Sequence, residues 1–148
     1  MTTVGTTIGG TGAGNHGGLP ATTFFSRTYD EARDLLVESR DYMAATRGIR
    51  FALPTRELIH SMETLRLTTR LTQIMAWLIL QRALHAGEIT MNDFLAPASR
   101  LGPQDICETA GGEATAELPA ILRELLTRSR KLYQRIHRLD EMIVRDNG

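Results

Sequence analysis

Residues 66–90 constrain the fold most, because they have the composition of a helix yet are apolar around most of the helix circumference. At about 100° per residue, two apolar faces lie on opposite sides of this helix. The chain's own helices can cover one face, so the other is covered by a second subunit or by the segment that follows. One face holds Leu58, Met62, Leu65, Ala76, Ile79, Leu80 and Ala83, and the other holds Leu67, Leu71, Ile74 and Leu78. We predict that the second face forms a dimer interface, with Trp77 at its border.

The composition favours a single domain with no nucleic-acid partner. The chain has 148 residues, and seventeen basic side chains balance seventeen acidic ones, whereas nucleic-acid-binding proteins usually have a basic excess. A single cysteine, Cys107, excludes an internal disulfide and fits a reducing compartment. No secretory signal is evident, and the apolar run 74–80 is far below the roughly 20 residues that a membrane span needs. We therefore expect a cytoplasmic protein with no membrane partner.

A flexible N-terminal tail is predicted before the folded domain. Residues 1–22 are rich in glycine and threonine and have too little apolar area to offset the entropy of ordering them. The spacing G-x-G-x-x-G at Gly12, Gly14 and Gly17 lacks the preceding strand of a dinucleotide site, so it is interpreted as part of the tail. The sequence thus predicts a disordered tail over 1–22 and one helical domain over 23–148.

Three long helices are predicted, over 24–48, 54–86 and 118–143. The first is expected to start in the segment from Phe24 to Leu36, where the spacing of Thr28 to Glu31 fits a capping box. A glycine at the end of the first helix and another at the end of the second are stop signals. A proline at the start of the second helix and another at the start of the third are start signals. A seam of coiled-coil type runs along the third helix and comprises Leu118, Leu122, Leu125, Ser129, Leu132, Ile136, Leu139 and Ile143.

An acidic, irregular crossover occupies residues 87–117. A structureless loop of this length is unusual, and Thr90 with Asp93 can cap one short helix while Pro103 opens another. The fold class is therefore all-α: an antiparallel three-helix bundle with a long irregular crossover before the third helix, assembled as a dimer.

The titratable residues do not form a catalytic or metal-binding pattern. His60, His85 and His137 lack a second ligand at helical spacing, and carboxylates near Cys107 would raise its pKa rather than activate it. The carboxylates between residues 31 and 41 are interspersed with arginines and lack the E-x-x-H element of bundle metal sites. We predict no catalytic residue, no metal and no cofactor.

Two charged surfaces are predicted to dock partners. The third helix carries a basic stripe, and the crossover carries exposed carboxylates, while neither is needed to hold the helices together. A merely solvated face is the alternative for both. The alternative function is a helical dimeric DNA-binding regulator, although its candidate helix-turn-helix region, 90–107, is acidic. The stripe comprises Arg128, Lys131, Arg135 and Arg138, and the acidic surface comprises Asp105 and Glu108.

Three segments together resemble the alphaproteobacterial RcdA family, the regulators of CtrA degradation. They are FFSRTYDEARDLL, RLTTRLTQIMAWLILQRALHAGEIT and RELLTRSRKLYQRIHRLDEMI, and the likeness extends over nearly all of residues 24–143. The second segment is the most specific, because Trp77 followed by Gln81-Arg82-Ala83 and Gly87-Glu88 is not a generic helical pattern.

This resemblance implies a small dimeric three-helix bundle without enzymatic activity. Members of the family are adaptors that help bring substrates such as CtrA to the ClpXP protease, together with a response-regulator partner. The resemblance carries over no catalytic residue, and it implies ClpXP components, the response regulator and protein cargo as partners.

Overall fold

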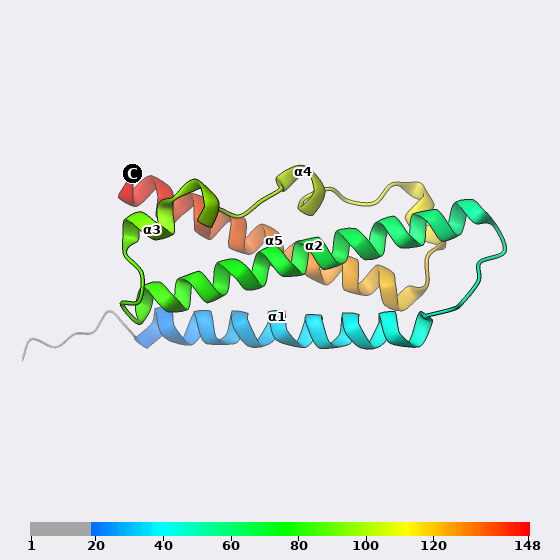
Figure 1. Cartoon of the computed structure of the whole chain (residues 1–148), viewed down its shortest axis with the longest axis horizontal. Coiled ribbons are helices and arrows are strands. Elements are labelled where there is room, and N and C mark those ends of the chain that lie inside the picture. Colours follow the sequence, from blue (N-terminus) through cyan, green and yellow to red (C-terminus); the bar gives the residue numbers. More distant parts are fainter. Residues whose placement is uncertain (1–18) are drawn as a thin grey trace, which may run out of the picture.

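The computed structural model describes the backbone of residues 19–148 and the side chains from Thr23 onward, and within that range it contains helices and no strand. The all-α class is confirmed. Three long helices each pack against the other two: α1 (Leu19–Thr46), α2 (Pro54–His85) and α5 (Ala120–Asn147). Four short helical segments lie between α2 and α5 (Figure 1): α3 (Met91–Leu95), η1 (Pro97–Ser99), α4 (Gln104–Cys107) and η2 (Glu113–Glu117).

The first helix starts earlier than the sequence predicts. Helix α1 begins at Leu19, and Thr28 lies inside it, where its hydroxyl donates to the Phe24 carbonyl oxygen at 2.9 Å. The capping box predicted at Thr28 is therefore wrong, because a threonine hydroxyl can also bond the carbonyl four residues back within a helix. Residues 1–18, with most of the predicted tail and the glycine motif at Gly12, Gly14 and Gly17, lie outside the described residues.

The other predicted helix signals are confirmed. Gly48 and Gly87 follow the ends of α1 and α2 with φ of 85° and 74°, a left-handed conformation that glycine adopts without strain. Pro54 is the first residue of α2. In α3 the Thr90 hydroxyl accepts from the Asp93 amide at 3.1 Å, and the Asp93 carboxylate accepts from the Thr90 amide at 2.9 Å. This reciprocal pair is the predicted capping box.

The direction of α5 corrects the expectation of an antiparallel arrangement throughout. Residues 70 and 77 of α2 bond residues 129 and 140 of α5, so the numbering rises along both helices in the same direction. By contrast, residues 128 and 135 of α5 bond residues 38 and 31 of α1. Helix α5 is therefore antiparallel to α1 and parallel to α2. The crossover runs back along the whole length of α2 before α5 begins (Figure 1), which makes the parallel pairing possible.

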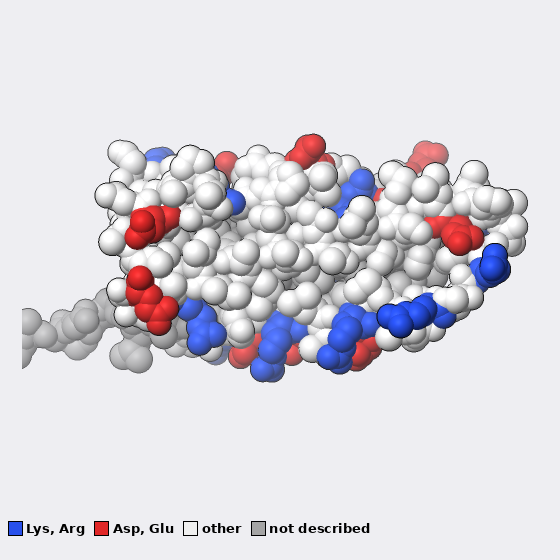
Figure 2. Space-filling view, viewed as in Figure 1, with Lys and Arg blue, Asp and Glu red and all other residues white. Residues whose placement is uncertain are grey.

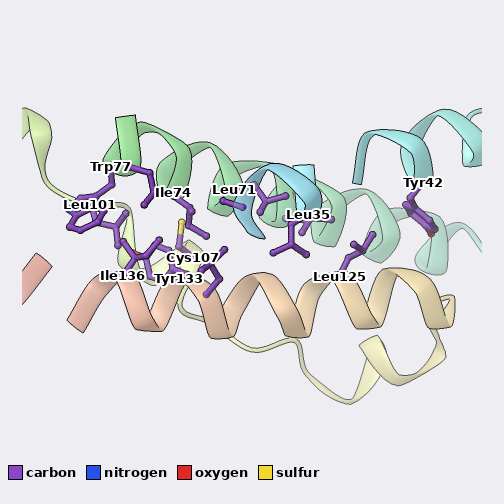
Figure 3. Packing of buried hydrophobic residues seen from close by; sticks show 14 of the residues in the cluster. Leu35, Tyr42, Leu71, Ile74, Trp77, Leu101, Cys107, Leu125, Tyr133 and Ile136 are labelled. Atoms are coloured by element: carbon purple, nitrogen blue, oxygen red, sulfur yellow. The ribbon is translucent and has the colours of Figure 1, made fainter. Parts of the chain in front are cut away.

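The core lies between the three long helices and is closed on one side by the crossover. Figure 3 shows Leu71, Ile74 and Trp77 of α2 facing side chains of α5 such as Tyr133 and Ile136. The predicted seam of α5 is buried from Leu118 to Ile136 and half-buried at Leu139 and Ile143.

One buried polar network ties the crossover to the core. The indole Nε1 of Trp77 donates to Asp140 at 2.9 Å, and Arg100 of the crossover donates to the second carboxylate oxygen, also at 2.9 Å. Because Asp140 is only 1% exposed, both donors are needed to satisfy its buried charge. The network therefore holds Arg100 against α2 and α5.

The two apolar faces of α2 have the opposite roles to those predicted: the predicted interface is buried in the core, and much of the predicted core face is exposed. The proposed interface residues are at most 1% exposed within the single chain, so they cannot form an interface with a second subunit. The physical reason is the volume of the side chains. The buried face has bulky side chains at the middle of α2, whereas the opposite face has only Thr69, Thr72 and Ala76 there. The residues concerned are Leu67, Leu71, Ile74, Trp77 and Leu78.

Candidate functional site

A buried arginine positions the crossover against the helices. Arg70 of α2 is 1% exposed, and its Nε donates to the Cys107 carbonyl oxygen at 2.6 Å while Nη2 donates to that of Thr109 at 3.2 Å. Its Nη1 donates to the Leu126 carbonyl oxygen at 3.0 Å and to the Ser129 hydroxyl at 2.9 Å, both on α5. One guanidinium therefore joins α2, α5 and the crossover.

Burial lowers the pKa of Arg70 to about 10, so the group remains charged at neutral pH. Arg70 is not among the functional residues predicted from the sequence. The sequence does contain a signal for it. Arg70 follows Leu67 by three residues and precedes Ile74 by four, so helical spacing places a charged residue on the same face as these apolar ones.

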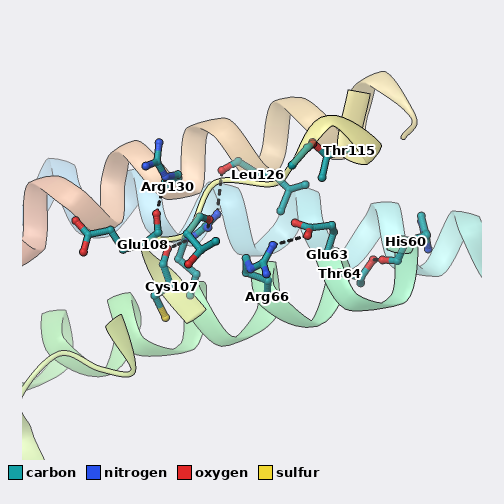
Figure 4. Close-up of polar contacts among 12 residues, drawn as sticks. His60, Glu63, Thr64, Arg66, Cys107, Glu108, Thr115, Leu126 and Arg130 are labelled. Carbon is teal, nitrogen blue, oxygen red and sulfur yellow. Dashed lines mark hydrogen bonds and ion pairs between the residues drawn. The ribbon is translucent and has the colours of Figure 1, made fainter. Parts of the chain in front are cut away.

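The predicted acidic surface lies on α4 and directly after it. The side chains of Asp105 and Glu108 are exposed and make no ion pair with any residue that the structure describes. The Glu108 carbonyl oxygen accepts from Nε of Arg130 at 2.7 Å, so the backbone here is held while the carboxylates are free (Figure 4). The neighbouring Cys107 is buried, and burial raises the pKa of its thiol, which disfavours the nucleophilic thiolate.

The predicted basic stripe divides into two pairs of residues with different surroundings. Arg128 donates to both carboxylate oxygens of Glu38, at 2.6 and 3.0 Å, and Arg135 donates to Glu31 at 2.6 Å. The Arg128 hydrogen bonds lower the pKa of Glu38. These two arginines link α5 to α1 through ion pairs at the surface, so they already have partners within the chain.

The other two members of the stripe are free. Lys131 and Arg138 are exposed and form no ion pair within the described part of the chain. Lys131 and Arg138 therefore remain the candidates for partner docking on α5. Arg128 and Arg135 would first have to give up their ion pairs with α1.

A third surface, which the sequence assigned to the core, is the outer face of α2. Leu58, Met62, Leu65 and Ile79 are 61%, 53%, 67% and 53% exposed. Figure 2 shows an uncharged band along the middle of this face, over α2, with most lysines and arginines along its lower margin. An apolar area of this length on a helix is typical of a protein interface.

Neither a cluster of metal ligands nor a membrane-spanning helix is found among the residues described. No group of three or more histidine, cysteine, aspartate and glutamate side chains is arranged to hold a metal ion there. Within the same residues, every helix is too short or too polar to cross a bilayer.

The chain is similar to proteins of a known family. A profile of the family described as "Protein of unknown function (DUF1465)" matches residues 19–148. The crystal structure of RcdA from Caulobacter crescentus is similar to this chain, with 32% identity and a TM-score of 0.63, over 80% of this chain and 89% of that one. The chain belongs to the RcdA-like family. Comparison with curated proteins gives no match.

Proposed function

We propose that the chain is a non-enzymatic cytoplasmic adaptor that helps deliver cell-cycle regulatory proteins to the ClpXP protease, together with a response-regulator partner. The similarity to RcdA over most of both chains carries this proposal. The exposed charges of Lys131 and Arg138 and of Asp105 and Glu108 support it, because they are available to partners and are not bound within the described chain. The DNA-binding alternative has less support, since α3 and α4 have only five and four residues and are short for a recognition helix.

We propose further that the adaptor is a homodimer of three-helix bundles, joined through the outer face of α2. The uncharged positions of this face alternate at spacings of four and three, the repeat of a coiled-coil seam. Small residues at its centre would let two copies of α2 approach closely. The seam comprises Leu58, Met62, Leu65, Thr69, Thr72, Ala76, Ile79 and Ala83.

A charge on this seam should separate the subunits without unfolding them. The double variant Leu65→Glu with Ile79→Glu is expected to be a monomer by sedimentation equilibrium, because dimerisation would bury two unpaired charges per subunit. Circular dichroism should show parental helicity. The matched control is Ile121→Glu, since Ile121 is 62% exposed on α5, outside the seam. A parental chain that is monomeric, or a double variant that remains dimeric, contradicts the proposed interface.

The docking role of the basic stripe is tested in a reconstituted degradation reaction with ClpXP, the response regulator and a cargo protein. Reversing the two free charges, Lys131→Glu with Arg138→Glu, should slow cargo degradation several-fold, with the largest effect at low salt, because rim charges mainly set the rate of encounter. The control reverses two exposed arginines outside α5, Arg27→Glu with Arg47→Glu. Equal degradation rates for the parent and the Lys131/Arg138 variant across the salt range would assign the docking surface to Asp105 and Glu108 or to another part of the chain.

A further inference from the structure

A basic pocket lies beside the crossover, where α2, η2 and α5 meet. Its volume is about 340 Å³, within the size range of small-molecule sites. Four cationic side chains line it: Arg70, Arg123, Arg130 and Lys131. The one carboxylate in its wall, Glu63, is already bound to Arg66.

The four cations of this pocket have no carboxylate partner in the described chain. Nε of Arg123 donates to the Leu118 carbonyl oxygen at 3.1 Å, and Nε of Arg130 donates to that of Glu108 at 2.7 Å. Both guanidinium groups are therefore anchored through Nε, while their Nη atoms have no acceptor among the described residues. Arg70 uses four of its five N–H donors on carbonyl and hydroxyl oxygens. The pocket thus presents fixed but unsatisfied donors.

The crossover completes the wall with backbone donors. Ala110 and Gly111 line the pocket, and neither backbone amide has an acceptor in the described part of the chain. A Cβ added at Gly111 would clash with the side chain of Thr115, so glycine lets the crossover pack closely against η2. Figure 4 shows Thr115, Leu126 and Arg130 on the same side of the molecule, above α2.

The charge of the pocket selects the class of ligand. A carboxylate would neutralise one of four positive charges, whereas a phosphate monoester carries a charge of about −1.5 to −2 at pH 7 and offers three acceptor oxygens. Arginine forks with free Nη atoms match such oxygens in pairs. We propose that this pocket binds the phosphate group of a small phosphorylated ligand, held by Arg123, Arg130, Lys131 and the amides of residues 110 and 111.

Calorimetric titration of the full chain with inorganic phosphate, pyrophosphate, and adenosine and guanosine diphosphates tests the proposal. Saturable binding of at least one probe is expected, with chemical-shift changes at the Ala110 and Gly111 amides in NMR spectra. Tighter binding of a nucleotide than of pyrophosphate assigns a nucleotide ligand, and equal binding assigns the phosphate group alone.

The variant Arg123→Gln with Lys131→Gln should weaken this binding at least about tenfold, because charge-assisted hydrogen bonds are lost. The matched control, Arg138→Gln with Arg145→Gln, removes the same charge from α5 outside the pocket, and it should bind like the parent. Circular dichroism checks that both variants are folded. Absence of saturable binding to every probe, or an equal loss in the control, would overturn the site.

Discussion

Replacing Ile74 by aspartate should unfold the chain. Ile74 lies on α2, faces α5 and is 0% exposed. The variant would therefore bury an unpaired carboxylate and remove apolar packing at this position. The combined cost is expected to exceed about 5 kcal/mol, which is comparable with the entire stability of a typical domain. Circular dichroism and thermal melting should show loss of helicity and of the cooperative transition.

The matched control for this prediction is on the other face of the same helix. Leu65 is 67% exposed, so Leu65→Asp should keep the cooperative unfolding transition at a concentration where the parent is monomeric. A folded Ile74→Asp monomer would instead support the assignment of Leu67, Leu71, Ile74 and Leu78 to a subunit interface. The pair of variants therefore decides which face of α2 is the core.

Replacing Arg70 by methionine should release the crossover from the helices. The substitution roughly conserves volume but leaves the carbonyl oxygens of Cys107 and Thr109 without their donor. We expect a loss of about 3 kcal/mol in the free energy of unfolding, measured by urea denaturation. Hydrogen exchange should rise most over residues 105–112.

Arg70→Lys is the informative comparison for this prediction. Lysine keeps the charge, but its three N–H donors arise from one atom and cannot span four acceptors on two elements. It should therefore recover only part of the lost stability. If exchange over residues 105–112 stays at the parental rate in both variants, the crossover is held by other contacts, such as that between Arg130 and Glu108.

Much of the local structure follows from the sequence itself. Gly48 and Gly87 end α1 and α2, Pro54 begins α2, and Thr90 with Asp93 caps α3, because each of these signals acts through backbone conformation or hydrogen bonds within a few residues. The buried seam of α5 follows from the helical repeat alone. The resemblance to RcdA, which the comparison with solved structures bears out, likewise lies in the sequence.

The tertiary structure decided which surfaces are internal. Arg128 and Glu38 are 90 positions apart, and Arg135 and Glu31 are 104 positions apart. No local spacing therefore predicts that these two arginines of the stripe have partners on α1. The parallel course of α5 along α2 likewise involves contacts between residues far apart in the sequence, such as those of Arg70 with Cys107 and Ser129.

The sequence by itself determined where α1 and α2 end and where α2 begins, and that α2 has two apolar faces. It did not determine which face is buried, because periodicity gives the angle of a side chain around its own helix and not the direction of the neighbouring helices. That choice was made by packing, since Leu71, Ile74 and Trp77 fill the space between α1 and α5 that Thr72 and Ala76 are too small to fill.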